Sequence, residues 1–447
     1  MASKNDPAAE RPLAILSAPG SRGDVNPMVA IGRRLKDQGF DCVISLAEPY
    51  APLAAAQGLI PMSLISHARF DELLGTPQVW KPLTGLRLIL EGAAGEFLQP
   101  HLDVIQKWKR PGRTVLVSHP LDFASRIHRD LDPETPLIDV FLSPAMIRDP
   151  RSPPRLSPWW FEPRRPAWLV DWGYRLGDRW LLDRYLGPSV NRARQRLGLE
   201  PVRRILDRWW LSPDRILSLY PEWFGPIPPL GGGDWHACGF PLAVNLPPAS
   251  DEPPSGWLPE PDQNEQRISA HLARQAGSSR APIFFTPGTA HRHARRFFEL
   301  AVAVCRRLDR PAIFATSHAE HLPPGLPDSI LSVGYVSLDR VLPRCAAIVH
   351  HGGIGTTAQG LAAACPQVVL PMAFDQFHNG QRLKELGVGR SLPRPTLSRL
   401  TGALTELLRD PEVTAACRQH ADRMTGPDGA ETAVRQILEW IRRTRGP

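Results

Sequence analysis

Short apolar segments alternate with helical patterns in two separate runs of this 447-residue chain, and this alternation limits the fold more than any other feature. The apolar segments of the first run cover residues 13–18, 41–46, 114–119 and 136–142. Those of the second run cover residues 282–286, 311–316, 330–336, 346–351 and 367–371. Buried apolar strands that alternate with helices form parallel sheets, so each run predicts an α/β unit.

A polar, proline-rich stretch separates the two runs and predicts a boundary between two domains. We expect a Rossmann-like domain over residues 1–242, a linker over 243–280, a second Rossmann-like domain over 281–427 and an amphipathic terminal helix over 428–447. The length fits this division, because domains commonly hold about 100–200 residues. Two such domains would face each other across a deep cleft.

A glycine-rich motif follows the segment at 346–351 and is expected to open a helix. It reads His350-His351-Gly352-Gly353-Ile354-Gly355-Thr356-Thr357. Glycines allow a ligand to approach the backbone, and a helix N-terminus offers free N–H groups and a positive potential. With two hydroxyl groups added, a diphosphate is the expected ligand; a tight turn with ordinary helix capping is the alternative. Adjacent histidines on a strand point to opposite faces, so they should not share a metal ion.

A second polar motif begins where the segment at 367–371 ends. It reads Pro371-Met372-Ala373-Phe374-Asp375-Gln376-Phe377-His378-Asn379. Ligands of open α/β sheets bind beyond the carboxyl ends of the strands. A carboxylate beside an amide suits hydrogen bonds to several sugar hydroxyls. A simple helix-capping role for Asp375 is the alternative.

These two motifs together, within residues 334–390, resemble the sugar-donor half of GT-B glycosyltransferases of the UDP-glycosyltransferase superfamily. Residues 20–35 (GSRGDVNPMVAIGRRL) resemble the first loop and helix of its bacterial and sterol-glycosylating members. Residues 285–290 (FTPGTA) resemble the loop that faces the donor phosphates. Within the superfamily, the chain looks most like the rhamnosyltransferases of rhamnolipid synthesis. The resemblance implies the GT-B fold, and transfer of a sugar from a nucleotide diphosphate to a hydroxyl of a lipophilic small-molecule or lipid acceptor.

The resemblance also implies which residues bind the sugar donor. They are Thr289 near the phosphates, Tyr335 against the base, Val336 at the base edge, His351, Gly353, Gly355 and Thr356 around the pyrophosphate, Gln359 at the ribose, and Asp375 with Gln376 at the transferred sugar. Many relatives have Glu where Gln359 stands. A neutral amide suits a deoxyribose, which favours a dTDP-sugar over a UDP-sugar and makes dTDP-rhamnose one candidate.

The expected catalytic base departs from the commonest family pattern. Many members place a His in the first loop, oriented by an Asp after a later strand, whereas this chain has Asp24 in the loop and His119 after the segment at 114–119. We predict that Asp24 removes the acceptor proton, that His119 tunes it, and that transfer inverts the anomeric centre. The alternatives are a capping role for Asp24, before a helix opened by Pro27, and an ordinary structural role for His119.

The net charge of +8 is concentrated in one segment. Residues 148–215 hold 15 Arg and 8 Asp or Glu, a net of +7, and residues 148–260 hold 10 of the 13 Trp. We expect Trp159, Trp160 and Trp168 to form an acceptor site or lid, or to touch a membrane surface. A packed surface loop is the alternative. Nucleic acid, which basic and aromatic residues together could also bind, is not the expected partner.

Six scattered cysteines and a polar N-terminus predict a cytoplasmic protein, with peripheral contact at the inner membrane as a further option. No carboxylate cluster accompanies the diphosphate motif, so we expect no metal and no cofactor besides the nucleotide-sugar substrate. A GT-B nucleotide-sugar 2-epimerase and a non-catalytic glycosyltransferase partner protein are the alternative functions. A nicotinamide dehydrogenase is disfavoured, because the first loop reads GSRGDVNP and not GxGxxG.

Overall fold

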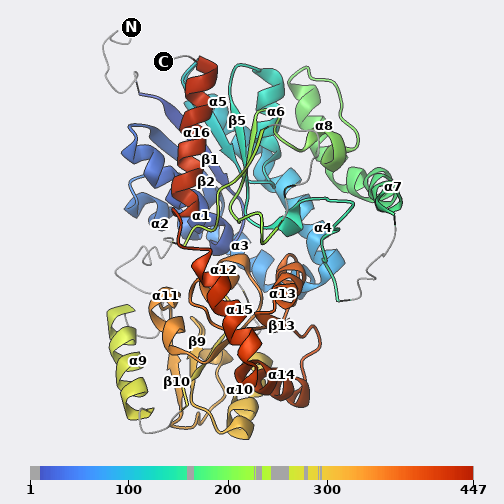
Figure 1. Cartoon of the computed structure of the whole chain (residues 1–447). Coiled ribbons are helices and arrows are strands. Elements are labelled where there is room, and N and C mark those ends of the chain that lie inside the picture. The colour runs from blue at the N-terminus through green and yellow to red at the C-terminus, as the bar shows by residue number, and fades with distance from the viewer. Residues whose placement is uncertain are drawn as a thin grey trace.

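Two parallel β-sheets with helices packed on them form the structure, the N-terminal one in the upper half of Figure 1 and the C-terminal one in the lower half. The computed structural model describes residues 11–158, 166–225, 227, 234–242, 261–275, 280–289, 291 and 294–445. This arrangement confirms the predicted α/β class.

The N-terminal sheet has seven parallel strands among the described residues, in the order β3-β2-β1-β4-β5-β6-β7. Its strands are β1 (Leu13–Ala18), β2 (Asp41–Ala47), β3 (Ile60–Ile65), β4 (Thr114–Ser118), β5 (Leu137–Phe141), β6 (Arg215–Ser218) and β7 (Asp234–Ala237). Its helices are α1 (Arg22–Asp37), α2 (Ala51–Ala56), α3 (His67–Gly75), α4 (Pro82–Gly92), α5 (Leu98–Trp108), α6 (Phe123–Leu131), α7 (Ala167–Gly177) and α8 (Asp183–Arg196). Shorter helical turns include η3 (Pro77–Trp80) and η6 (Asp178–Leu182).

The C-terminal sheet has six parallel strands among the described residues, in the order β10-β9-β8-β11-β12-β13. Its strands are β8 (Ile283–Thr286), β9 (Ala312–Ala315), β10 (Ile330–Val333), β11 (Ala347–His350), β12 (Gln367–Val369) and β13 (Gly389–Ser391). Its helices are α9 (Pro261–Gln275), α10 (Arg295–Leu308), α11 (Leu338–Val341), α12 (Ile354–Ala362), α13 (Gln376–Glu385), α14 (Leu397–Arg409) and α15 (Pro411–Asp422), and the chain ends in α16 (Gly429–Arg445).

Each apolar segment predicted as a strand contains one, because its side chains are buried between helical layers. All six residues of β1 and all four of β11 are buried, for example. Four strands were not predicted: β3 is half-exposed, and β6, β7 and β13 are short and partly polar. In β6, the buried Arg215 is stabilised by Asp234 of β7 at 2.6 Å.

The predicted terminal helix is present as α16, and it packs on the N-terminal half. Ala430, Ala433 and Ile437 are buried in the same apolar cluster as Val25 and Val29 of α1. Figure 1 shows α16, in red, running alongside the N-terminal sheet. The chain therefore crosses between the two halves twice, once before α9 and once before α16.

The two crossings lie next to each other. The Gly429 N–H, at the start of α16, donates a hydrogen bond to the Phe240 carbonyl at 3.0 Å. A Cβ at position 429 would lie 2.1 Å from the Gly239 carbonyl oxygen, so only glycine fits this contact. Leu242, two residues beyond Phe240, accepts a hydrogen bond from Gln359 of α12 at 3.0 Å.

The predicted linker over 243–280 is wrong in its second part. Residues 243–260 lie outside the described residues, but residues 261–275 form α9. Ile268 of α9 is 1% exposed and belongs to the apolar cluster of the C-terminal sheet. A linker would not bury an apolar side chain in this way, so we propose that α9 belongs to the C-terminal domain.

The first helix also begins earlier than predicted. Pro27 was expected to open it, but α1 starts at Arg22 and holds Pro27 in its interior. Asp24 accepts a hydrogen bond from the Ser21 amide at 2.7 Å, which stabilises the first turn. Asp24 therefore lies within the helix and not in a loop before it.

None of the helices in the described ranges is long and apolar enough to cross a membrane. The six cysteines are unpaired, as expected. The cytoplasmic location stays a prediction.

Candidate active site

Both sheets have a point where the order of added strands reverses: between β1 and β4 in the first, and between β8 and β11 in the second. Ligands of open α/β sheets bind beyond the carboxyl ends of the strands at such points. Asp24 follows β1 and His119 follows β4, while Thr289 follows β8 and His351 follows β11. The topology thus brings four predicted site residues to the two switch points.

Asp24 and His119 lie together, as predicted. His119 is fully buried, and its Nε2 is 3.4 Å from Asp24 Oδ1. The Leu121 N–H donates to His119 Nδ1 at 3.2 Å, so the hydrogen of the neutral ring is on Nε2 and faces the carboxylate. The Ser21 N–H donates to the other carboxylate oxygen at 2.7 Å.

These neighbours keep Asp24 ionised. Burial raises the pKa of Asp24, but His119 and the Ser21 amide together lower it by more than burial raises it. The pKa of Asp24 therefore lies below the ordinary value of 3.8. The Asp24 side chain is one quarter exposed, at 25%, so a reacting hydroxyl could reach it. A reachable carboxylate that is ionised at neutral pH can act as a general base.

The glycine motif folds as predicted, with its last glycines at the N-terminus of α12. Gly352 has a φ of +96°, and a Cβ there would lie 2.6 Å from a Val369 methyl. A Cβ at Gly288, on the loop after β8, would lie 2.5 Å from the ring of His351. Glycine at both positions therefore lets the two loops approach and encloses the His351 ring between them.

His351 is neutral at physiological pH. Burial, with a smaller contribution from His291, lowers the pKa of His351 to about 4. Its buried Nδ1 has no hydrogen-bond partner among the described residues. Gly355 and Thr356 are accessible in the first turn of α12, whereas Thr357, proposed with Thr356 as a hydroxyl donor, is fully buried in that helix. This site can accept an anion through the helix amides and a polar ring.

His350 lies on the other side of the motif and is structural. Its Nε2 is 3.0 Å from Gln367 Oε1, and its Nδ1 accepts the Gly352 N–H at 3.2 Å. Burial lowers the pKa of His350 to about 3. The two histidine rings stand at 89° to each other, in keeping with the prediction that they do not share a metal ion.

Asp375 is held by a side chain that sequence reasoning did not single out. Asn379, fully buried in α13, donates to Asp375 Oδ2 at 2.8 Å and to the Gly352 carbonyl at 2.9 Å. Its own Oδ1 accepts a hydrogen bond from Ser143, which follows β5 of the N-terminal sheet, at 3.2 Å. One amide therefore joins the sugar motif, the glycine motif and the opposite domain.

The carboxyl of Asp375 differs in its chemistry from that of Asp24. Burial raises the pKa of Asp375 to about 6; Asn379 lowers it, and the negative charge of Asp24 raises it. Asp24 thus influences the pKa of Asp375 although the two residues belong to different halves of the molecule. One is firmly ionised and the other titrates near neutral pH.

The side-chain oxygen of Gln376, predicted at the sugar, is bonded within its own loop. Its Oε1 accepts the backbone N–H groups of Met372 and Ala373 at 2.9 and 3.2 Å. This leaves its amide nitrogen for a sugar. Phe374, between them, has a φ of +55°, a strained conformation for a bulky residue.

An aromatic group covers this strained turn and was not predicted. Trp80 of η3 lies 6.2 Å from Phe374 and 5.1 Å from His291, measured between ring centroids. Trp80 comes from the N-terminal half, Phe374 and His291 from the C-terminal half. An isolated Trp in sequence gives no sign of such a contact.

Tyr335 and Val336, predicted at the base, lie between α9 and the first loop. The Arg22 guanidinium stacks over the Tyr335 ring at 4.4 Å. Asn264 of α9 donates to the Tyr335 carbonyl at 3.3 Å, and Val336 is buried in the C-terminal core. Arg22 and Asn264 thus fix the position of the predicted base-binding segment.

Gln359, predicted at the ribose, is 9% exposed in α12. Its amide nitrogen donates to the Leu242 carbonyl, so its oxygen is the atom left for a ligand. Gly353 caps α12, and Thr289 is exposed beyond Gly288.

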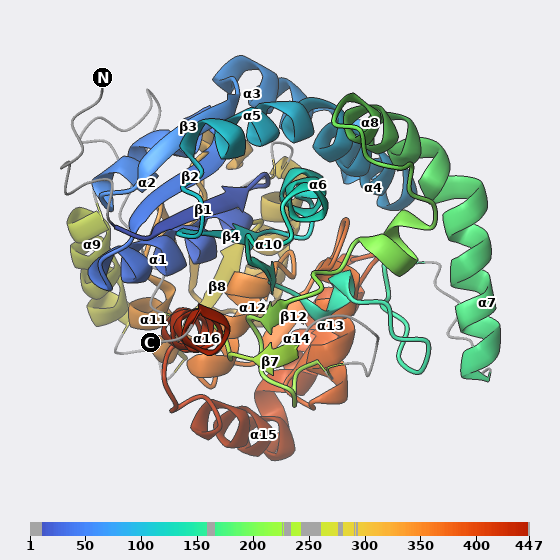
Figure 2. The ribbon, with the colours of Figure 1, turned by 90° about the horizontal axis from the view of Figure 1, so that it is seen from above.

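Of the three predicted acceptor residues, Trp168 is described and does not lie at this site. Trp159 and Trp160 lie outside the described residues. Trp168 lies on α7 with 68% of its surface exposed. Figures 1 and 2 both show α7 at the periphery, apart from α1, α12 and α13. The structure therefore gives Trp168 no contact that an acceptor lid would need.

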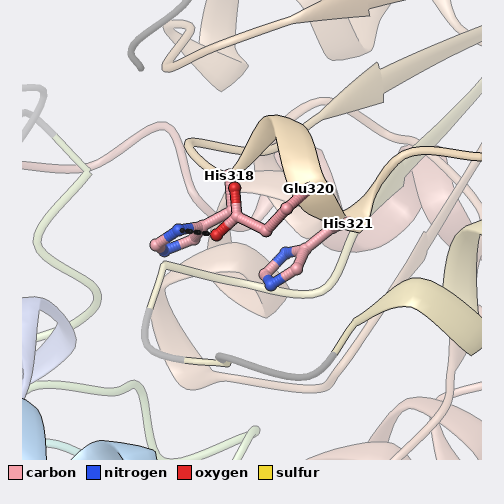
Figure 3. Close-up of side chains that lie close together, drawn as sticks. All are labelled: His318, Glu320 and His321. Atoms are coloured by element: carbon pink, nitrogen blue, oxygen red, sulfur yellow. Dashed lines mark hydrogen bonds and ion pairs between the residues drawn. The ribbon is translucent and has the colours of Figure 1, made fainter. Parts of the chain in front are cut away.

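The described residues contain one group of three side chains that could hold a metal ion: His318, Glu320 and His321, after β9 (Figure 3). Glu320 is 71% exposed and lies 3.1 Å from His318 Nδ1. The His321 Nδ1 is 3.4 Å from the Thr316 hydroxyl. The group is separate in sequence from Asp24, His351 and Asp375, and nothing in its geometry links it to them.

Comparison with known proteins agrees with this architecture. Residues 301–439 match the family described as erythromycin biosynthesis protein CIII-like, C-terminal domain. The chain is 28% identical to O-mycaminosyltylonolide 6-deoxyallosyltransferase of Streptomyces fradiae, over 96% of this chain and 97% of the relative. It is 27% identical to vancomycin aglycone glucosyltransferase of Amycolatopsis orientalis, over 96% and 98%.

Solved structures share the fold. The kitacinnamycin glycosyltransferase superposes with a TM-score of 0.67 at 19% identity, covering 97% of this chain and all of that one. The glycosyltransferase VinC in complex with dTDP superposes with a TM-score of 0.63 at 18% identity, covering 96% and 100%.

The chain has the two-sheet GT-B fold of these structures, and over nearly its whole length it is similar to glycosyltransferases. It is an enzyme that transfers a glycosyl group.

Proposed function

We propose that the enzyme transfers a sugar from dTDP to a hydroxyl group of a lipophilic small molecule, with inversion and without a metal ion. The dTDP donor is supported by the neutral Gln359 and by the dTDP bound to the similarly folded VinC. The acceptor class is supported by relatives named for macrolide and glycopeptide substrates. A UDP-sugar is the alternative donor. A rhamnosyl donor with a hydroxyacyl lipid acceptor, which the rhamnolipid resemblance implies, is the more specific alternative.

The observation that carries the proposal is the hydrogen bond that joins the Asp375 side of the site to the N-terminal half. Asn379 donates to Asp375 at 2.8 Å and to the Gly352 carbonyl at 2.9 Å, and it accepts a hydrogen bond from Ser143 of the N-terminal half at 3.2 Å. Asp24, with His119, belongs to the N-terminal half, which shapes the acceptor side in GT-B enzymes. This link supports a base on the acceptor side and a sugar-holding acid on the donor side of one reaction centre.

The chemistry follows from these positions. The Asp24 carboxylate accepts the proton of the acceptor hydroxyl while that oxygen attacks the anomeric carbon. The bond from the anomeric carbon to the diphosphate oxygen breaks on the opposite face, and dTDP leaves with the electron pair. The α12 amides and His351 stabilise the charge that develops on the diphosphate. Asp375 holds the sugar hydroxyls.

A panel of dTDP- and UDP-sugars against mixed acceptors tests the reaction class. We expect nucleoside diphosphate release that requires both partners and persists in excess chelator. Release without any acceptor would indicate an epimerase-like or hydrolytic enzyme, and no release with any pair would favour a non-catalytic partner protein. A chelator-sensitive rate would contradict the metal-free proposal. The acceptors should include a neutral aglycone and a hydroxyacyl lipid, and the donors should include dTDP-rhamnose. These choices separate transfer to a small-molecule aglycone from rhamnosyl transfer to a lipid.

Asp24→Asn tests the base. We expect kcat to fall by about 10²- to 10⁴-fold, the usual contribution of a general base, while dTDP affinity is unchanged. Asp37→Asn, an exposed acid at the end of the same helix, is the matched control and should keep full activity. Near-normal transfer by a folded Asp24→Asn enzyme would remove Asp24 from the mechanism.

A further inference from the structure

The outer side of α7 and η6 carries a line of large apolar side chains that no other described element covers. Trp168, Trp172, Leu176 and Trp180 are 68%, 58%, 43% and 69% exposed. They recur every fourth residue, which places them on one slowly turning helical stripe. We call these four residues the α7 stripe. No residue of α7 is buried, so the helix contributes little to the core.

Polar contacts fix the end of α7 to the rest of the N-terminal half, so the helix that carries the α7 stripe is held in one position. Asp178 is fully buried and bonds to Arg148 Nη1 at 2.5 and 2.6 Å through its two oxygens. Arg148 also stacks on Tyr174 of α7 at 5.2 Å. Figure 2 shows α7 at the edge of the molecule, beyond α4 and α8.

A basic groove adjoins the α7 stripe. It is an open cavity of about 670 Å³ along α8, and its charged lining comprises Arg179, Asp183, Arg184, Arg192 and Arg203. These four arginines form no ion pair with the described acidic residues. The single acid, Asp183, already accepts the Arg204 and Ile205 amides at 2.6 and 3.0 Å. Among the described side chains, the groove therefore carries four arginines against one acid.

The stripe and the groove are one continuous surface. Arg179 lines the groove, and its guanidinium lies 5.6 Å from the ring centroid of the neighbouring Trp180. Indole rings settle at the boundary between lipid head groups and acyl chains, while arginines beside them bind phosphate oxygens. A protein partner would have to match both parts, whereas a bilayer containing anionic phospholipid supplies both at once.

We propose that the α7 stripe and the basic groove dock the enzyme on an anionic phospholipid bilayer, with the Trp side chains in the interface and the four arginines on lipid phosphates. This surface is distinct from the Asp24–Asp375 site and does not depend on which acceptor the enzyme uses.

Co-sedimentation with lipid vesicles tests the proposal. Wild-type protein should pellet with phosphatidylcholine vesicles that contain about 30 mol% phosphatidylglycerol, and release at about 0.5 M salt. Trp172→Ser/Trp180→Ser should bind at least about tenfold more weakly. Arg184→Glu/Arg192→Glu should lose the preference for anionic over neutral vesicles. Leu131→Ser, which changes an apolar residue 40% exposed on α6, is the matched control and should bind like wild type.

Folding and donor binding are followed in the same variants by thermal unfolding and dTDP titration, and both should be unchanged. Wild-type protein that stays in the supernatant with anionic vesicles at low salt would overturn the proposal. Equal pelleting of wild type and Trp172→Ser/Trp180→Ser would also overturn it. A wild-type dimer that this double substitution abolishes, without vesicle binding, would show that a second copy covers the stripe.

Discussion

At the scale of single residues, neighbours decide the proton affinity of each acid in the site. His119 donates toward Asp24 from Nε2, because Nδ1 already accepts the Leu121 amide. We therefore expect His119 to act through Asp24, as a positioning residue, and its effect to appear in the pH profile.

Removal of His119 should raise the pKa of Asp24, since burial then acts with one opposing interaction fewer. A lowered pKa keeps the base ionised as the pH falls, so His119→Ala should lose kcat/KM at a higher pH than wild type does. His119→Gln, which keeps an N–H donor, should recover part of the kcat/KM that His119→Ala loses at acidic pH. The measurement is kcat/KM from pH 4 upward, and an unshifted acidic limb would contradict the role.

The pKa of Asp375 is shifted in the opposite direction from that of Asp24. Its pKa is raised from 3.8 to about 6, so the folded state holds this proton more tightly than the unfolded chain does. Its contribution to stability therefore becomes unfavourable as the pH rises from about 4 to 6.

Asp375→Asn keeps an oxygen for Asn379 and removes the buried charge. We expect it to raise the free energy of unfolding at pH 7.5 by up to about 3 kcal/mol, since the pKa of Asp375 is raised by about two units and one unit equals about 1.4 kcal/mol. The gain should vanish near pH 4, while sugar transfer falls at both values. Urea unfolding of both proteins at the two pH values measures this, and a variant less stable at pH 7.5 would refute it.

Sequence reasoning proposed Asp24 and His119 because the family resemblance gave one position in the first loop and one after a later strand, and the structure has their side chains 3.4 Å apart. It did not identify Asn379, whose partners Gly352 and Ser143 are 27 and 236 residues away. It also could not reveal that the Gln376 oxygen accepts hydrogen bonds from its own loop. Contacts made by distant segments depend on the completed fold.

At the scale of elements, the loop between β11 and α12 depends on one glycine. Gly352 has a positive φ of +96°, and a Cβ would meet a Val369 methyl at 2.6 Å and the Gln376 carbonyl at 3.0 Å. The packing of β12 and α13 against this turn therefore leaves no room for a side chain at position 352.

Gly352→Ala should lower the free energy of unfolding by about 2 kcal/mol or more and weaken dTDP binding. Gly402→Ala, in the exposed interior of α14 with open space around its Cβ, should be neutral or stabilising by up to about 1 kcal/mol. Urea unfolding and calorimetric titration with dTDP compare the pair. Equal stability of both variants would show that the loop can relax.

Helices and strands were predicted well where the apolar pattern was clear, as in β1 and α16. The beginning of α1 was not, because Ser21 and Asp24 stabilise a first turn that Pro27 does not reveal. The helix α9 was read as linker, because its sequence is polar and only a few residues such as Ile268 face the core. Short polar strands such as β13 form because neighbouring strands supply their hydrogen bonds.

At the scale of the whole molecule, α16 makes the two ends of the chain interdependent. Ile437 is fully buried in the N-terminal cluster although it lies ten residues before residue 447. Its methyl groups contribute to a core that consists of residues from the first half and of other residues of α16, namely Ala430, Ala433 and Val434.

Ile437→Ala should lower the free energy of unfolding by about 2–5 kcal/mol, the usual range for such a core truncation. Hydrogen exchange should quicken in α1 and β1, over four hundred residues away in sequence, more than in α10. Glu439→Ala, exposed on the same helix, should change neither. Faster exchange confined to α16 would mean that the helix can detach without loosening the N-terminal core.

The contact between Gly429 and Phe240 has a mechanical consequence. The chain passes between the halves in two segments, one after Phe240 and one before Gly429. This hydrogen bond joins the two segments, so they share a single pivot. A rotation about that pivot stretches neither segment, whereas sliding or twisting of one half would pull on both. Because Gln359 of α12 is hydrogen-bonded to the Leu242 carbonyl beside this pivot, we expect α12 to move little in such a rotation. The contact between Trp80 and Phe374 also joins the two halves, so it would have to break if they separated there.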